Sequence, residues 1–245
     1  MELLNIVNSY SGKLIPVFIR IAAMFSFIPF FGAKATPMMF KVGLVLAFSL
    51  LVAPFAKVNA EDPFRSILDA IFVGMAMGLA VRIIFGAVEM AAQWISLQMG
   101  FGLAAVFNPQ FGETMGPLNF FYMFLTMVFF FALDIHHHFI EGIVRSFEIE
   151  QVQYKTIFQT IINLNTLLFP LAFKIAAPVI VVQMLVNVAM GFLSKAMPQA
   201  NIFFVSFPVL LAIGFIFIIA SLSLTFMLIS KAFLNMKEAI FLFTR

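Results

Sequence analysis

The sequence contains no cysteine and little charge. Lys, Arg, Asp and Glu make up 10% of its 245 residues, whereas a typical soluble domain carries about 25%. Without cysteine the chain can form no disulfide, no Cys-ligated metal centre and no Cys nucleophile, although this absence fixes no cellular compartment. The net charge of +3 is spread over the loops without a basic cluster, so we expect no nucleic-acid binding.

Tryptophan, tyrosine and the common catalytic motifs are also scarce or missing. The chain has one Trp and three Tyr beside 35 Phe, although Trp and Tyr normally line both membrane interfaces. Two interpretations stay open: a general bias toward Phe, or an apolar surface that meets other proteins rather than lipid. The sequence has no H-E-x-x-H, P-loop, G-x-S-x-G or strand-linked G-x-G-x-x-G motif. These absences leave nucleotide hydrolysis without support, and we expect no cofactor.

Apolar residues dominate instead, at 63% of the chain. They form six blocks, roughly at residues 14–31, 42–56, 66–88, 118–138, 171–193 and 205–230. A membrane-spanning helix needs about 20 residues, so the last four blocks are long enough and we expect an all-α polytopic membrane protein. Arg20 interrupts the first block and no small-residue cleavage site follows, so we expect no cleaved signal peptide. Positive charges follow consecutive blocks, so the positive-inside rule selects no orientation.

A polar interval at 141–165 divides the chain into two halves. Five apolar residues recur there at near-helical spacing and predict a short amphipathic helix: Phe147, Ile157, Ile161, Leu164 and Leu168. The remainder, about 166–245, is expected to form a helical hairpin that turns near 194–204. Pro198 and Pro208 predict an irregular start to its second helix.

The run from Leu97 to Asn119 departs most from a membrane pattern. It is rich in Gly, Pro and polar residues between two apolar blocks. Lipid cannot satisfy a broken backbone, so such a run must be buried in protein or line a watery cavity. Its apolar side chains could plug an aqueous path and move aside on glycine joints at Gly100, Gly102, Gly112 and Gly116. An ordinary surface loop between two helices is the alternative.

Six charges lie inside apolar blocks: Arg20, Asp69, Arg82, Glu89, Asp134 and Lys174. Each costs about 2.5–3.5 kcal/mol at a bilayer centre. Ion pairing between packed helices or at interfaces is the favoured interpretation for Arg20, Arg82, Glu89 and Asp134, ahead of a proton relay. Asp134 and His138, at i and i+4 with two histidines between them, could hold a metal. The cluster ends a block, so ordinary solvation of a helix end is favoured and no metal is expected. Gly74 and Gly78 form a small-xxx-small pattern that predicts close helix packing.

Several motifs, in order along the chain, carry a resemblance to a known family. They are Arg20 with Phe30-Phe31-Gly32 and Pro37; Lys41-Val42-Gly43-Leu44; Glu89 to Gln93; Leu97-Gln98-Met99-Gly100-Phe101-Gly102 with Asn108-Pro109; Ala132-Leu133-Asp134 with His136-His137; and Pro198-Gln199-Ala200-Asn201-Ile202-Phe203 with Phe207-Pro208. By these the chain resembles, nearly end to end, the FliR family of membrane components of the flagellar type III export gate, which has relatives in virulence secretion. It departs from the family pattern at Asn108, where an acid is usual, and at Leu210, where a lysine is common.

The resemblance implies a subunit of a hetero-oligomer with FliP-like and FliQ-like proteins. Residues 1–145 would be a FliP-like region of long bent hairpins, and 146–245 a linker helix with a FliQ-like hairpin. The assembly would sit at the flagellar basal body in the bacterial inner membrane, raised toward the periplasm, beside FlhB-like and FlhA-like export components. Unfolded proteins would pass through it, driven by energy from elsewhere in the apparatus.

The resemblance also implies that the loop plugs the closed pore. The expected plug residues are Phe107, Asn108, Pro109, Phe111 and Met115. We therefore predict a structural and gating subunit of a protein export channel, with no catalytic activity of its own. One alternative is a self-sufficient secondary transporter with Arg20, Glu89 and Asp134 around a midplane site, although the paired interrupted helices of such transporters are missing. Another is an intramembrane hydrolase that uses Asp134 and its neighbouring histidines.

Overall fold

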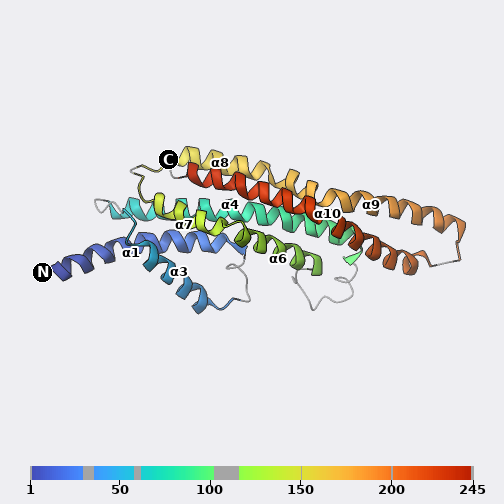
Figure 1. Cartoon of the computed structure of the whole chain (residues 1–245), viewed down its shortest axis with the longest axis horizontal. Coiled ribbons are helices and arrows are strands. Elements are labelled where there is room, and N and C mark those ends of the chain that lie inside the picture. Colours follow the sequence, from blue (N-terminus) through green and yellow to red (C-terminus); the bar gives the residue numbers. More distant parts are fainter. Residues whose placement is uncertain are drawn as a thin grey trace. The chain divides into compact units, whose positions relative to one another are not determined.

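The computed structural model describes residues 2–29, 36–57, 62–101, 116–149, 151–199 and 201–243, which fold into helices without a strand (Figure 1). The helices are α1 (Glu2–Phe27), α3 (Met38–Val52), α4 (Pro63–Gln98), α6 (Pro117–Ala132), α7 (Ile135–Arg145), α8 (Tyr154–Thr166), α9 (Leu168–Ala196) and α10 (Ile202–Leu242). The predicted all-α fold is confirmed. The start of α4 follows capping rules: Pro63 takes the first helical position, and Asp62 Oδ1 accepts the backbone N–H of Arg65 at 3.2 Å.

The fourth apolar block is not one continuous helix. It divides into α6 and α7 at Asp134, whose φ of 54° lies in the left-handed region. A left-handed residue cannot continue a right-handed helix, so the chain turns there. The block at 118–138 is long enough to span a membrane only as this pair of helices, which is bent by 64°, because one residue's backbone conformation interrupts a continuous apolar pattern.

The second half of the chain matches its prediction more closely. α9 ends at Ala196 and α10 begins at Ile202, which confirms a turn near 194–204. The irregular start expected for the second helix was wrong, because Pro208 lies inside an unbroken α10. Apolar helices tolerate an internal proline when neighbouring groups satisfy the backbone it frees.

The predicted amphipathic helix corresponds to α8, which buries Ile157, Thr160 and Leu164. Its actual extent is narrower than the periodic pattern suggested. Phe147 lies in the turn after α7, and Leu168 is the first residue of α9. The apolar periodicity therefore located α8 correctly, but the predicted pattern included one residue before the helix and one after it.

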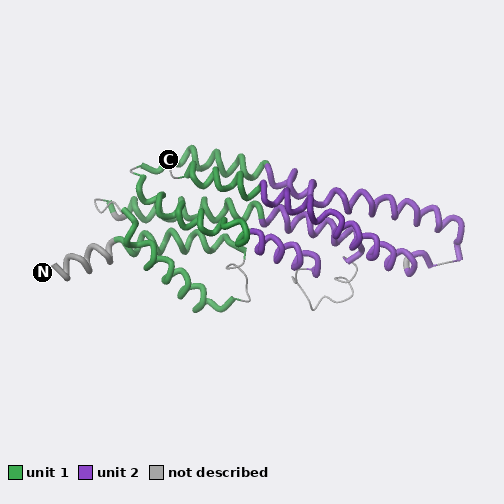
Figure 2. The backbone as a smooth tube through the Cα atoms, viewed as in Figure 1, with its two compact units in different colours: residues 1–84, 130–166, 232–245 green, residues 85–129, 167–231 purple. Residues whose placement is uncertain are grey.

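The chain forms two compact units, shown in Figure 2. Unit 1 comprises residues 1–84, 130–166 and 232–245, and unit 2 comprises residues 85–129 and 167–231. Each unit draws on segments from both sides of residue 145. The expected division into a FliP-like region and a FliQ-like hairpin concerns likeness to other subunits, so it stays a prediction.

Within unit 1, α1 packs very closely against α4. An added Cβ at Gly74 would lie 2.3 Å from the carbonyl oxygen of Arg20, and one at Gly78 would lie 2.5 Å from that of Met24. Both distances are far inside van der Waals contact, so only glycine permits this approach. The small-xxx-small pattern thus serves packing between α4 and α1 in the same chain.

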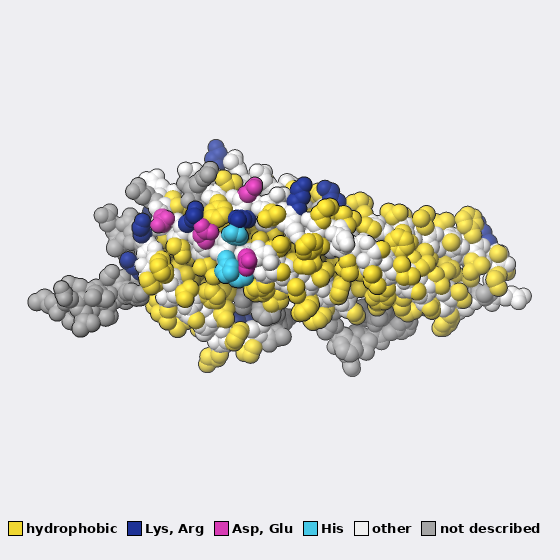
Figure 3. Space-filling model, viewed as in Figure 1, with side chains coloured by type: hydrophobic (Ala, Val, Ile, Leu, Met, Phe, Trp, Pro, Cys, Tyr) yellow, Lys and Arg dark blue, Asp and Glu magenta, His cyan; other side chains and the backbone are white. Residues whose placement is uncertain are grey.

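Unit 2 is almost free of charge. Its described charged residues are Glu89, Lys174, Lys195 and Lys231. On the face shown in Figure 3, the acidic side chains and histidines lie over unit 1, whereas apolar atoms dominate over unit 2. Such an apolar surface requires lipid or another protein to cover it.

Three stretches among the described residues are long and apolar enough to cross a membrane: Phe64–Gln98, Tyr154–Ala196 and Phe204–Leu242. The bent pair of α6 and α7 would count as a fourth. Within their most apolar windows, 67% of residues are buried inside the chain for the α4 stretch, but 22% for each of the other two. The hairpin of α9 and α10 is therefore the part that most needs outside contacts.

Candidate functional site: the ends of the α4–α6 connection

The loop expected to gate a pore begins where α4 ends. The N–H of Met99 donates to the carbonyl of Ile95 at 2.9 Å, and the N–H of Gly100 donates to that of Leu97 at 3.1 Å. Gly100 then adopts a φ of 85°, a conformation that favours glycine and commonly ends helices. The run predicted to be irregular from Leu97 thus starts a few residues later, because α4 continues through Gln98.

Most of the predicted gate residues lie outside the described residues. These are the plug positions Phe107, Asn108, Pro109, Phe111 and Met115 and the glycines Gly102 and Gly112. The described loop end beyond them is Gly116, whose carbonyl accepts the N–H of Phe120 at 3.1 Å as α6 begins. A Cβ at Gly116 would lie 3.5 Å from Ser96 Oγ, an ordinary contact. Packing alone therefore does not require glycine at 116, and its hinge role stays a prediction.

The N-terminal end of the loop rests on the α9–α10 hairpin of unit 2. A Cβ at Gly100 would lie 3.2 Å from the ring of Phe207 in α10. The rings of Phe101 and Phe215 meet edge to face, with centroids 6.5 Å apart. Gly100 thus meets two requirements at once, since its backbone is left-handed and its Cα approaches an aromatic ring. The loop consequently starts at a point that packs against α10.

A buried amide and a glycine support that packing point. Gln183 in α9 is fully buried, and its Nε2 donates to the carbonyl of Leu210 in α10 at 2.7 Å. Gly214 faces Met99 and Gln183 so closely that a Cβ there would lie 2.5 Å from Met99 Cε and 2.6 Å from Gln183 Nε2. Sequence reasoning missed both residues. The available signal was an amide at Gln183 inside a charge-free apolar stretch.

The buried charge of unit 1 is Arg20. Its Nη1 donates to the carbonyl oxygen and to Oγ of Ser146, at 2.8 and 2.7 Å. Its guanidinium carbon lies 3.7 Å from the centre of the Phe147 ring, within cation–π range. Burial lowers the pKa of Arg20 to about 9, while the charge of Asp69 opposes that shift. The guanidinium therefore stays charged at neutral pH and joins α1 to the turn after α7.

Asp69 belongs to the same side of unit 1. Its Oδ1 accepts a hydrogen bond from the hydroxyl of Tyr154 at the start of α8. The Tyr154 ring also meets Phe72 edge to face, with centroids 4.9 Å apart. These contacts join α4 to α8 next to the Arg20 network. They therefore help to fix how α4 and α8 pack within unit 1.

A model of the bacterial export proteins, family 1, matches residues 12–236, nearly the whole chain. The chain belongs to this family. The membership confirms the resemblance drawn from the motifs.

This export-family chain is similar to several proteins that share a name. It is 30% identical to the flagellar biosynthetic protein FliR of Bacillus subtilis (strain 168), over 94% of this chain and 93% of that protein. It is 31% identical to the protein of that name from Pectobacterium carotovorum subsp. carotovorum, over 80% and 79%. It is 28% identical to that of Aquifex aeolicus (strain VF5), over 88% and 87%.

The other charges that we expected to be buried in this export-family chain have different surroundings. Arg82 and Asp134 are exposed and Glu89 is half-buried. Burial within the chain was therefore wrong for Arg82 and Asp134. An interface role for these charges stays a prediction.

The i, i+4 pair of Asp134 and His138 does not come together. Asp134 Oδ1 lies 3.3 Å from Nδ1 of His137 instead. His138 Nδ1 lies 3.8 Å from Oε2 of Glu141. The left-handed backbone at Asp134 displaces its side chain from the face that helical spacing predicts.

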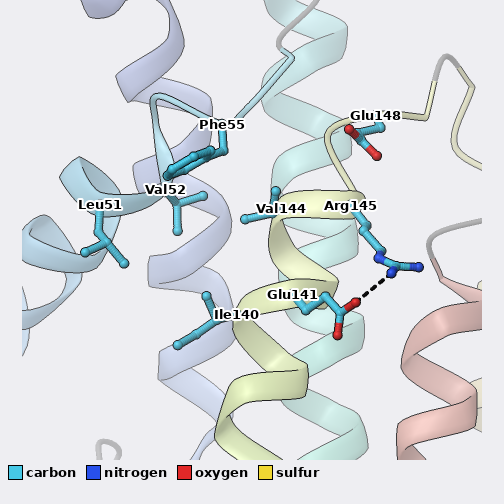
Figure 4. Close-up of a pocket in the computed structure, with 8 residues that line it drawn as sticks. All are labelled: Leu51, Val52, Phe55, Ile140, Glu141, Val144, Arg145 and Glu148. Carbon is cyan, nitrogen blue, oxygen red and sulfur yellow. Dashed lines mark ion pairs between the residues drawn. The ribbon is translucent and has the colours of Figure 1, made fainter.

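Unit 1 also carries an open groove between α3 and α7, shown in Figure 4. It has a volume of about 390 Å³ and apolar walls from Leu51, Val52, Phe55, Ile140 and Val144, with a charged rim of Glu141, Arg145 and Glu148. The Arg145 and Glu141 side chains pair at 2.6 Å, and Glu148 pairs with Lys57 at 3.4 Å. The charged side chains at the rim of the groove are thus paired within the chain, as expected of a surface with a structural role.

Proposed function

We propose that this chain is a structural and gating subunit of the flagellar type III protein export channel, which passes unfolded flagellar proteins across the bacterial inner membrane. The observation that carries the proposal is the near-full-length match to flagellar FliR proteins in several bacteria. Its long apolar helices and uncovered hairpin surface are consistent with a membrane-associated subunit of a larger assembly.

The expected partners are FliP-like and FliQ-like subunits in a hetero-oligomeric gate, together with FlhB-like and FlhA-like components. The α9–α10 hairpin exposes large apolar side chains along its length, among them Leu185, Phe192, Ile216 and Ile219. A gate raised toward the periplasm would cover these side chains with neighbouring subunits rather than lipid. Coverage by protein would also explain why the chain has so few Trp and Tyr residues.

Co-purification tests the assembly. Expressed with FliP-like and FliQ-like subunits, the chain is expected to purify as a stable complex, whereas alone it is expected to aggregate. A stable, monodisperse monomer that needs no partner would contradict the interpretation of its surface.

We further propose that Phe107, Asn108, Pro109, Phe111 and Met115 plug the closed channel. The support is their place in the chain, between the end of α4 at Gly100 and the start of α6 at Pro117. Gly100, Gly102, Gly112 and Gly116 would let the plug move aside, with Gly100 packed against Phe207 in the closed state. The plug is the part of the chain whose movement would open the path.

Deletion within residues 107–117 tests the plug. In membranes that contain the whole assembled complex, this deletion is expected to cause leakage of ions or small solutes. Substitution of an equal number of residues by Gly and Ser is the matched control for loop length and should leak as well, because it removes the apolar seal. Unchanged permeability in an intact assembly would overturn the gating role while leaving the structural role standing.

No catalytic step is assigned to the chain. Arg20 is held by Ser146 and Phe147 rather than in an open site, which disfavours the secondary transporter. That alternative requires substrate-coupled proton uptake by the purified chain alone. Absence of uptake, together with normal export in the assembled complex, is the result that we expect.

A further inference from the structure

The junction of α6 and α7 brings three metal-ligating side chains together. Asp134, His136 and His137 each offer one ligand atom, and these atoms all lie within 4.8 Å of one another. Regular helical spacing separates adjacent residues by about 100° around the axis. The left-handed Asp134 breaks that spacing and sets its carboxylate beside the first turn of α7.

The contacts within this cluster are close but incomplete. Asp134 Oδ1 and His137 Nδ1 are 3.3 Å apart, and the ring centroids of His136 and His137 are 4.1 Å apart. Phe131 holds the other side of the His136 ring, at a centroid distance of 5.2 Å. His136 Nδ1 is buried without a hydrogen-bond partner. Buried polar atoms normally have partners, so this nitrogen needs an explanation.

We propose that Asp134, His136 and His137 bind a divalent transition-metal cation of the Zn²⁺ class, with its fourth position open to water or to a partner's side chain. Two imidazole nitrogens with one carboxylate oxygen is a ligand set that suits Zn²⁺. Tetrahedral Zn²⁺ places its ligands about 3.3 Å apart, given Zn–N bonds of about 2.0–2.1 Å. The Asp134 and His137 side chains are 69% and 67% exposed, so they can rotate inward to reach that spacing.

The site differs from the pair that helical spacing suggested. His138 faces Glu141 in the first turns of α7 and stays outside the cluster. The proposal also departs from the expectation of a merely solvated helix end. It goes beyond the export function, since bound metal would fix the turn at which α6 gives way to α7.

The test uses the full chain in complex with its partners, purified in detergent without a histidine tag. Zn²⁺ binding is measured by titration calorimetry, and Co²⁺ is the spectroscopic probe, because its visible absorption is strong in a tetrahedral site. We expect one site per chain. The variants H137A and D134N should each weaken Zn²⁺ binding by roughly tenfold or more. Asparagine is chosen at position 134 because, like aspartate, it tolerates a left-handed backbone.

The matched control is H138A, which removes a neighbouring imidazole outside the cluster and should leave the site intact. Equal loss in H138A and H137A would overturn the proposal, because it would indicate non-specific binding to histidines. Binding by the wild type no tighter than by the H136A/H137A double variant would overturn it too. Co-purification of each variant with its partners verifies that folding is retained.

Discussion

At the residue scale, Arg20 is a charged side chain that is buried together with polar and aromatic partners. Its side chain is 3% exposed yet charged, and the Ser146 oxygens and the Phe147 ring replace part of the water that it loses, while Nε is buried without a hydrogen-bond partner. A buried charge is costly unless such partners are present. The same guanidinium holds the turn after α7 against α1, so its placement also fixes backbone.

Replacing Arg20 by methionine should destabilise unit 1 by about 1–3 kcal/mol, because two charge-assisted hydrogen bonds are lost and the Ser146 carbonyl loses a donor. Thermal unfolding of the detergent-solubilised chain measures this. The control is R145M, which removes an exposed arginine paired with Glu141 and should cost about 0–1 kcal/mol. Equal shifts would show that burial of Arg20 contributes nothing specific.

Gly74 offers a second test at this scale. G74A places a methyl group 2.3 Å from the Arg20 carbonyl oxygen, so α1 and α4 must separate, at a cost of about 1–3 kcal/mol. In G43A the new methyl group has nothing within 4 Å, and stability should stay unchanged or rise by up to about 1 kcal/mol. G74A should therefore lower the unfolding temperature, whereas G43A should leave it unchanged or raise it. A similar loss of stability in both variants would contradict close packing at Gly74.

At the scale of elements, the end of α4 and the α9–α10 hairpin form one anchoring point. Met99, directly after α4, lies against Gly214 of α10, next to the hydrogen bond from Gln183 to Leu210. Apolar helices gain little from burial in an apolar medium, so such polar contacts and close approaches help fix how they pair. The loop that follows Gly100 inherits its starting position from this point.

Q183M should loosen this anchor. It keeps volume and apolar contacts but removes the donor to Leu210, and the loss is expected to be about 0.6–2 kcal/mol. N187M, one turn further along α9, removes an exposed amide and should change stability by less than about 0.5 kcal/mol. Unfolding in detergent measures both. If N187M costs as much as Q183M, the buried hydrogen bond has no particular importance.

At the scale of the whole molecule, the distribution of apolar surface dominates. α4 buries most of its apolar window within the chain, whereas α9 and α10 leave most of theirs uncovered. Charges are concentrated in unit 1, and unit 2 has few among its described residues. A protein with this surface is complete only when something else covers the hairpin.

A photo-crosslinking residue at Leu185, which is 65% exposed, identifies what covers it. In the assembled export complex it should form adducts with partner subunits. The same residue at Val179, which is fully buried in the chain, should give intrachain products alone. Mass spectrometry distinguishes protein adducts from lipid adducts, and exclusive lipid adducts at Leu185 would contradict a protein-covered hairpin.

The sequence by itself determined the helical class, the hairpin turn before Ile202, the amphipathic α8 and the family, because apolar periodicity, turn residues and motifs are local properties of the chain. Tertiary structure decided the rest. It selected Arg20 rather than Arg82 for burial, because burial depends on which helix faces meet. It brought Gln183 and Gly214 to the end of α4, since those contacts join distant segments. It also assembled Asp134 with His136 and His137 rather than with His138, because one left-handed residue displaces a side chain from the face that helical spacing assigns to it.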